Sequence, residues 1–206
     1  MKTMIGIPCM ESIPTVTVKS LLSLNHDGVE FCFTMNSLIY DARNSLAEKA
    51  CNQGFDRILF LDSDMVFEPD LYERLSARLD EGYDFVTGLY FSRRMPIIPM
   101  IYNEVIFRER DGRKIPICTE FSDYPRESFF QIKGCGFGGC MMSTKMLLEI
   151  GKKFGLPFSP VLGFGEDLSF CLKAEQAGFE LYCDSTIKMG HMSHCIVQEM
   201  DYLKGE

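Results

Sequence analysis

The sequence predicts an α/β fold in which helices flank a mainly parallel sheet, with a small antiparallel extension in the second half. Strand-like and helix-like segments alternate through residues 1–91, which is typical of parallel strands joined by helices. Residues 58–61 read Ile-Leu-Phe-Leu, a continuous apolar run expected of a strand that is covered on both faces. A chain of 206 residues can bury one core, so we expect residues 1–206 to form a single domain.

The elements of the first half are bounded by residues that start or stop helices. Pro14 favours a helix start, because proline is common in the first turn. In the next expected helix, the apolar residues Ala42, Leu46 and Ala50 recur at a spacing of four. Gly54 then supplies a stop signal. The expected strands cover residues 4–8, 29–35, 57–61 and 85–91, and the expected helices cover residues 15–24, 38–53 and 69–79.

The second half of the chain is less regular. Residues 92–133 contain four prolines among short strand-like pieces, so we expect loops and the antiparallel extension there. A glycine cluster follows at residues 134–139. Further helices are expected at residues 144–153 and 166–178, and a strand is expected at residues 179–183.

The composition is that of an ordinary globular protein, with 46% hydrophobic and 24% charged residues. With 21 basic and 29 acidic residues the net charge is −8, which argues against binding bare nucleic acid. No apolar run approaches the roughly 20 residues of a membrane-spanning helix, and the run near the start is too short for a signal peptide. The nine cysteines are scattered, so we expect reduced thiols and a cytoplasmic protein.

The strand expected at residues 57–61 runs directly into Asp62-Ser63-Asp64. In open parallel sheets, ligands bind outside the carboxyl ends of the strands. Mg²⁺ or Mn²⁺ is usually held by one or two carboxylates together with substrate phosphates, which an Asp-x-Asp turn would allow. The alternative is that Asp62 stabilises a turn and Asp64 is a solvated loop acid, since aspartate is common in turns.

A second acidic pair, Glu166-Asp167, opens the expected helix that follows the loop Gly163-Phe164-Gly165. Carboxylates near a helix N-terminus are stabilised by the dipole and by free backbone N–H groups, so capping is one interpretation. A carboxylate held by a rigid helix beside a mobile loop would also suit a general base. The residues alone favour neither interpretation.

Histidines are rare in this chain, and two of them lie three residues apart at His191 and His194. A lone histidine is more often structural than a ligand, but this pair follows an acidic candidate metal site. Cys183, His191, His194 and Cys195 could instead suggest zinc. None of these residues shows the Cys-x₂-Cys spacing of common structural zinc sites, which argues against it.

Several motifs occur in a set order along the chain. They are Ala42-Arg43-Asn44, Asp62-Ser63-Asp64, the glycine cluster at residues 134–139, Gly165-Glu166-Asp167, and Gly190-His191. In this order and spacing, the chain resembles glycosyltransferases of the GT-A (Rossmann-like) fold, in the large inverting family that also contains cellulose and hyaluronan synthases. The resemblance runs from Ile5 to about His191.

The resemblance implies a role for each acidic motif. Asp64 would be a direct metal ligand, and Asp62 would contact the donor ribose or metal-bound water, so that both belong to the Mn²⁺ or Mg²⁺ site. His191 would complete the metal shell, with His194 as the alternative ligand. Asp167 would be the catalytic base that deprotonates the acceptor hydroxyl, and Glu166 would orient it.

The resemblance also implies a nucleotide site. Pro8 and Glu11 fall where the nucleoside pocket of the family begins, and Arg43 would approach the base or the phosphates of the donor. We expect Arg43 on the solvent side of its helix, with little packing role. Arg93 and Arg94 are either further contacts to the diphosphate or solvated loop charges, and the residues slightly favour the second.

The resulting prediction is a metal-dependent enzyme that moves a single sugar from a nucleotide sugar to a hydroxyl. Residues 1–91 would bind the donor, and residues 92–206 would bind the acceptor and carry the base. The chain has no Trp and therefore no Gln-x-x-Arg-Trp motif, which argues against processive synthesis. A nucleotidyltransferase and a catalytically silent nucleotide-sugar-binding subunit are the alternatives. The acceptor stays open among glycans, lipid-linked sugars, proteins and modified nucleic acids.

Overall fold

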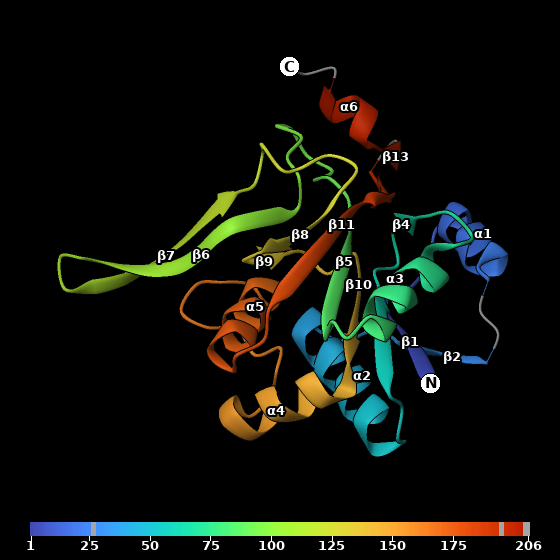
Figure 1. The fold of residues 1–206 in the computed structure, drawn as a ribbon, viewed down its shortest axis with the longest axis horizontal. Helices are drawn as coiled ribbons and strands as arrows, with labels where there is room; N and C mark the ends of the chain where they lie inside the picture. Colours follow the sequence, from blue (N-terminus) through green and yellow to red (C-terminus); the bar gives the residue numbers. More distant parts are fainter. Residues whose placement is uncertain (26–27, 194–195, 204–206) are drawn as a thin grey trace.

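The structure of the protein is a computed structural model that describes residues 1–25, 28–193 and 196–203. At its centre lies a seven-stranded mixed sheet with the strand order β2-β1-β3-β10-β5-β11-β8 (Figure 1). Strands β10 and β8 run against the other five. The strands are β1 (Thr3–Pro8), β2 (Val29–Thr34), β3 (Arg57–Leu61), β5 (Phe85–Leu89), β8 (Phe129–Ile132), β10 (Gly139–Ser143) and β11 (Leu181–Lys188).

Helices cover both faces of the sheet, as the fold class requires (Figure 1). Side chains of β3 alternate between two cores: Ile58 and Phe60 pack in one, and Leu59 and Leu61 in the other. The first core lies under α2 (Ile39–Asn52), α4 (Thr144–Phe154) and α5 (Glu166–Gln176). The second lies under α1 (Thr15–Ser23) and α3 (Leu71–Asp80). The predicted α/β fold is therefore confirmed.

The central strand β10 was not expected from the sequence. It lies between β3 and β5 and is antiparallel to both. Cys140, Met141 and Met142 are completely buried there. The segment is only five residues long, begins with a glycine and leads straight into α4, so its pattern does not distinguish a strand from a helix start. Its insertion places the preceding glycine cluster beside the end of β3.

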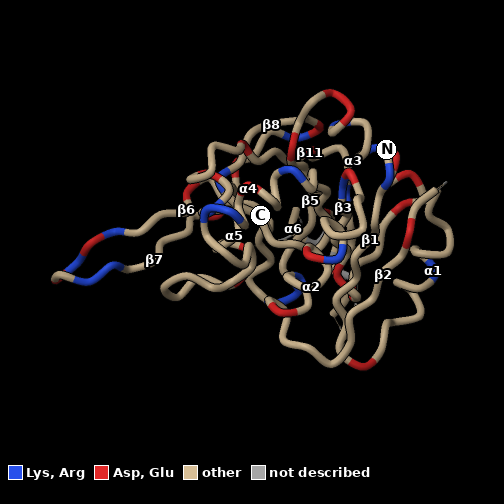
Figure 2. Tube along the Cα trace, turned by 90° about the horizontal axis from the view of Figure 1, so that it is seen from below, with Lys and Arg blue, Asp and Glu red and all other residues tan. Residues whose placement is uncertain are grey.

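The antiparallel extension predicted for the second half is a long hairpin of β6 (Ile101–Arg110) and β7 (Arg113–Glu120) that projects from the body (Figure 1). Asp111 and Gly112 form its turn with φ values of 52° and 69°, the left-handed conformations that a two-residue hairpin turn favours. Charges of both signs alternate towards the tip (Figure 2). At its base, the short strand β9 (Gly134–Cys135) pairs with β6. Further along β6, the ring of Phe107 packs against that of Phe164, with 5.2 Å between the ring centres.

The other expected helices and strands lie within two residues of their predicted bounds, except that β11 extends to Lys188 rather than residue 183. Five short elements were not expected: β9, β4 (Met65–Val66), β12 (Gly190–Met192), β13 (Ile196–Val197) and α6 (Glu199–Leu203). Within the described ranges, no helix is both long and apolar enough to cross a membrane.

Candidate active site

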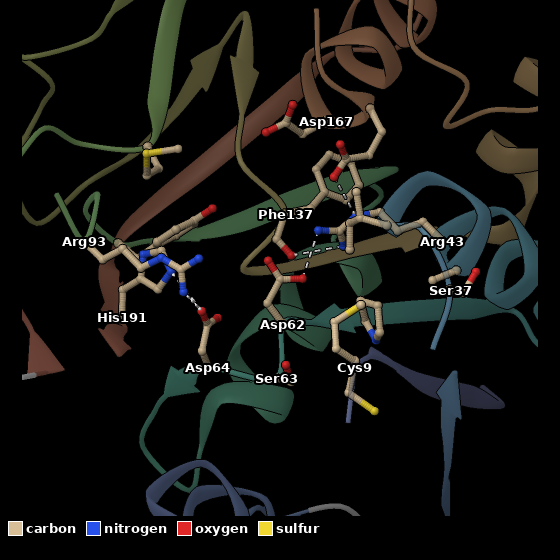
Figure 3. Close-up of a pocket in the computed structure, with 17 residues that line it drawn as sticks. Cys9, Ser37, Arg43, Asp62, Ser63, Asp64, Arg93, Phe137, Asp167 and His191 are labelled. Carbon is tan, nitrogen blue, oxygen red and sulfur yellow. Dashed lines mark hydrogen bonds and ion pairs between the residues drawn. The ribbon is translucent and has the colours of Figure 1, made fainter. Parts of the chain in front are cut away.

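A cavity of about 370 Å³ opens where β1, β3 and β5 end (Figure 3). This is the edge at which open α/β sheets bind ligands. Both halves of the sequence line it, so donor and acceptor regions, if divided as predicted, share one cavity. The lining residues are Pro8, Cys9, Met10, Ser37, Ile39, Ala42, Arg43, Asp62, Ser63, Asp64, Tyr90, Arg93, Met100, Phe137, Glu166, Asp167 and His191.

Arg43 of α2 holds the two acidic motifs together. Its Nη2 donates to Oδ1 of Asp62 at 2.9 Å, and its Nε donates to Oε1 of Glu166 at 3.3 Å. The guanidinium also donates to the carbonyl oxygen of Phe137 at 3.5 Å and lies 5.2 Å from the centre of that ring. Arg43 is only 2% exposed, so the expectation that it faces solvent is wrong. Its position is a consequence of α2 packing over the sheet, with the cavity at the helix start.

Burial shifts the pKa values of both Arg43 and Asp62. Burial lowers the pKa of Arg43, but the attraction of Asp62 and Glu166 outweighs it and raises the pKa overall, so this side chain stays charged. Burial also raises the pKa of Asp62, and the ion pair with Arg43 offsets this only in part, while Asp64 raises it further. Asp62 therefore lies in a site with more negative charge than its arginine partner neutralises.

Asp64 and His191 meet through a pairing of two short strands. His191 in β12 is opposite Met65 in β4, and the Met192 N–H donates to the carbonyl oxygen of Asp64 at 2.8 Å. This places Nε2 of His191 at 3.5 Å from Oδ2 of Asp64. Residues 127 positions apart in sequence are thus neighbours at the cavity.

The imidazole of His191 is oriented by its other nitrogen. Nδ1 lies 2.9 Å from the carbonyl oxygen of Phe91, an acceptor only, so Nδ1 carries a proton and donates it. Nε2 is then the nitrogen that faces Asp64. Burial lowers the pKa of His191, but the hydrogen bonds with Asp64 and Phe91 outweigh burial and raise it. A backbone carbonyl behind one ring nitrogen is the usual arrangement of a metal-binding histidine.

Asp167 lies in the first turn of α5, at the side of the cavity above Asp62 (Figure 3). The N-cap of α5 is Gly165, so neither acid of the pair is the capping residue. Oδ1 of Asp167 accepts the backbone N–H of Leu168 at 2.7 Å. Burial, followed by the neighbouring charge of Glu166, raises the pKa of Asp167 from 3.8 to about 6. A carboxylate with a pKa near the working pH suits a general base.

Tyr90 is a site residue that the sequence did not indicate. Its hydroxyl oxygen accepts the Gly138 N–H at 3.1 Å, and its ring meets the His191 ring edge-on at 5.5 Å. A Cβ on Gly136 would lie 2.1 Å from the Tyr90 hydroxyl oxygen, and one on Gly138 would lie 2.8 Å from its Cζ. The Gly138 carbonyl in turn accepts the Asp62 N–H at 3.1 Å. The glycine cluster therefore makes room for Tyr90. The run of glycines at residues 134–139 is the feature of the sequence that could have indicated a side chain packed closely there.

The remaining candidates divide between the cavity and its surroundings. Pro8 lines the cavity with Cys9 and Met10, whereas Glu11 is exposed and is not among the lining residues. Arg93 lines the cavity and forms an ion pair with Asp64, while half of its side chain is exposed, so a contact to the diphosphate stays a prediction. Arg94 lines a neighbouring hollow instead.

The zinc alternative gains nothing from the structure. Cys183 is completely buried in β11, and the eight cysteines of the described ranges are free. Two members of that proposed set, His194 and Cys195, lie outside the described residues.

The lining residues fit a divalent cation held jointly with a substrate. Among the described side chains around the cavity, four carboxyl groups face two guanidinium groups, an excess of two negative charges when the carboxyl groups are ionised and His191 is neutral. No three His, Cys, Asp or Glu side chains in the described part of the chain form a complete metal cluster. Asp64 and the oriented Nε2 of His191 could supply two ligands, and phosphate oxygens would supply others, as is usual for Mg²⁺.

Comparisons with known proteins support the fold. No protein-family model matches the sequence, and no curated protein matches it. Among solved structures, A197 from STIV is similar with a TM-score of 0.65 and 21% identity, covering 94% of this chain and 86% of that one. GalNAc-T7 with UDP, GalNAc and Mn²⁺ is similar with a TM-score of 0.61 and 12% identity, covering 93% of this chain and 44% of that one. At such identities the likeness concerns the fold alone. The chain has a GT-A-like fold.

Proposed function

We propose that this protein is a metal-dependent, inverting glycosyltransferase that moves a single sugar from a nucleotide sugar to a hydroxyl acceptor. The observation that carries the proposal is the sharing of one cavity by two groups of different chemistry. The Asp64–His191 pair fits a cation-bound diphosphate, and the separate Asp167 carboxyl, with a pKa of about 6, fits a base. The UDP, GalNAc and Mn²⁺ in the GalNAc-T7 structure support this class of ligand.

The cavity residues suggest how the donor would lie. Cys9 and Ser37 lie on the side of the cavity away from His191 (Figure 3), and the apolar lining residues next to them in sequence, Pro8, Met10 and Ile39, would suit a nucleoside. The diphosphate would then reach Asp64 and His191, with the sugar towards Asp167. A divalent cation bound there would hold the diphosphate oxygens and neutralise the charge of the leaving group.

The chemistry then follows from the position of the base. Asp167 would accept the proton of the acceptor hydroxyl while its oxygen bonds to the anomeric carbon and the bond to the diphosphate breaks. One displacement of this kind inverts the anomeric carbon. Glu166 and Asp62 would keep their positions through the ion pairs with Arg43.

The test is a panel of common nucleotide sugars incubated with the protein and Mn²⁺, followed by analysis of the released products. We expect a nucleoside diphosphate from at least one donor, with loss of release in chelator. Release of pyrophosphate from a nucleoside triphosphate and a sugar phosphate would instead identify a nucleotidyltransferase. Because water can take the place of the unknown acceptor in slow hydrolysis, binding of a donor without any release, hydrolysis included, would identify a silent binding subunit.

A calorimetric measurement tests the metal requirement separately. A nucleoside diphosphate should bind far more tightly in Mn²⁺ or Mg²⁺ than in chelator, because the cation bridges it to Asp64 and His191. Equal affinities in the two conditions would remove the metal from the proposal. A transfer product of retained anomeric configuration would remove the single displacement.

A further inference from the structure

The two arginines of the cavity differ in how they are held. The side chain of Arg43 is 3% exposed and donates to three groups on three other segments. The side chain of Arg93 is 49% exposed and forms an ion pair with Asp64, whose side chain is 24% exposed. An ion pair that is open to water contributes little to stability, whereas breaking a fully buried one is costly. The contact between Arg93 and Asp64 can therefore be exchanged at little cost.

The backbone that carries Arg93 is well held, so only its side chain needs to move. Residues 92–98 form a tight loop after β5, in which the Ser92 N–H donates to the Ile98 carbonyl at 2.8 Å. The Ile98 N–H returns a hydrogen bond to the hydroxyl of Ser92 at 3.1 Å. The Arg93 Cα is thereby fixed near the cavity mouth.

The side chain of Arg93 also has space around it. Arg93 and Asp64 line both the main cavity and a neighbouring hollow of about 370 Å³, which is bounded as well by Pro14, Arg94 and Met192. The Arg93–Asp64 ion pair thus lies between two open volumes (Figure 3 shows it from the main cavity). A guanidinium that leaves Asp64 can turn without displacing packed side chains.

We propose that Arg93 is an exchangeable counter-ion: it neutralises Asp64 when no cation is bound, yields that carboxylate to the cation, and then binds the diphosphate of the donor. This rests on the proposed function, because it assumes that Asp64 is a cation ligand. A planar guanidinium suits two phosphate oxygens at once, which an ammonium group does not. Arg93 would compete with a cation for Asp64 when no donor is present. When the cation carries the donor, Arg93 would strengthen binding through the diphosphate.

The proposal predicts effects of opposite sign for one substitution. In Arg93→Ala, Mn²⁺ alone should bind about two- to fivefold more tightly than in the wild type, since removal of an exposed ion pair frees Asp64. In saturating Mn²⁺, the same variant should bind a nucleoside diphosphate about tenfold or more weakly, through loss of charged hydrogen bonds. Mn²⁺ binding can be followed by electron paramagnetic resonance, and nucleotide binding by calorimetry.

Arg94→Ala is the matched control. It removes the same charge one residue away, from a side chain that lines the neighbouring hollow and not the main cavity. Its Mn²⁺ and nucleotide affinities should stay near those of the wild type. Equal tightening of Mn²⁺ binding in both variants would overturn the proposal, because it would reflect net charge alone. Unchanged nucleotide binding in Arg93→Ala would overturn it as well.

The test of the Arg93 exchange can fail or succeed independently of the test of the proposed function. Mn²⁺ binding needs neither a sugar nor turnover, so a protein that releases no nucleoside diphosphate can still show the difference between the two variants. In that case the exchange at Asp64 stands and the transferase proposal fails. If the donor panel succeeds while Arg93→Ala behaves like Arg94→Ala, the exchange fails and the transferase proposal stands.

Discussion

A buried arginine lies near each end of strand β3, Arg57 at one end and Arg43 of α2 at the other. The balance of charges around these two arginines differs. At the amino end, Arg57 is 2% exposed, donates to Oδ1 of Asp80 at 2.6 Å and reaches the Ser76 hydroxyl and carbonyl oxygens. At the carboxyl end, Arg43 binds both Asp62 and Glu166. One arginine thus serves one acid at the first end, and acids outnumber arginines at the second.

The difference shows which end of the sheet is built for a ligand. Asp80 is 56% exposed, so water can solvate it, and the Arg57 cluster needs no further ion. The Arg43 cluster lies beside Asp64 and Asp167 in a cavity where carboxyl groups outnumber guanidinium groups, a surplus of negative charge. Burial first, and then the charges of neighbouring carboxylates, raise the pKa of Asp62 and Asp167 above ordinary values. A stable fold does not require such a surplus. It is the expected feature of a site that takes up a cation.

The largest expected effect is that of Asp167→Asn at the cavity end. Loss of a general base typically lowers a rate about a hundredfold to ten-thousandfold, and we expect a loss in that range for transfer. Asn keeps the oxygen that accepts the Leu168 N–H but cannot take up a proton. Steady-state kinetics with the donor found in the panel would measure it. A near-normal rate would return Asp167 to a structural role.

The same variant should not lose stability at neutral pH. Asp167 has a folded-state pKa of about 6, above its ordinary 3.8, so its ionisation destabilises the fold as pH rises through this window. Asn cannot ionise, so the variant should gain at most about 3 kcal/mol in its free energy of unfolding at neutral pH. The gain should vanish below about pH 4. Urea denaturation at both pH values would check the sign.

The second largest effect compares the two arginines directly. Arg43→Ala should lower the free energy of unfolding by about 3–5 kcal/mol, since it leaves two largely buried carboxylates unpaired. This replaces the expectation, drawn from the sequence, that Arg43 has little packing role. Arg57→Ala should cost about 1.5–3 kcal/mol, because Asp80 can be solvated. Only Arg43→Ala should also weaken donor binding. Equal losses in stability and in donor affinity for the two variants would contradict the difference between the two ends of β3.

The pH dependence of transfer is expected to be of intermediate size. Because Asp167 must be ionised to accept a proton, kcat/KM should fall about tenfold per unit below about pH 6 and level off above it. The residual rate of Asp167→Asn should lack this step. A flat profile between pH 5 and 7 in the wild type would contradict the pKa assigned to the base.

The smallest effect is expected for Ser63→Ala. Ser63 lines the cavity between the two aspartates but carries no charge towards a cation. The transfer rate should change less than about twofold, and the free energy of unfolding by less than about 0.5 kcal/mol, as for most surface substitutions. A large loss of metal affinity would mean that the hydroxyl is a ligand and that the charge argument is incomplete.

Much of the fold and part of the site follow from local pattern. Alternating apolar segments predicted most helices and strands to within two residues, because the periodicity of buried positions is a property of each segment alone. Asp62 and Asp64 at a strand end, and Glu166 and Asp167 at a helix start, could be placed at the cavity for the same reason.

The sequence by itself thus determined the α/β class, the edge of the sheet that carries the site and the acidic groups in it. Only the tertiary structure decided how these groups are paired. The burial of Arg43 between Asp62 and Glu166 depends on the packing of α2 and α5 around the end of β3. The meeting of Asp64 and His191 depends on β4 pairing with β12, and the place of Tyr90 on the insertion of β10. Strand order and register join residues far apart in the chain, and no local pattern encodes them.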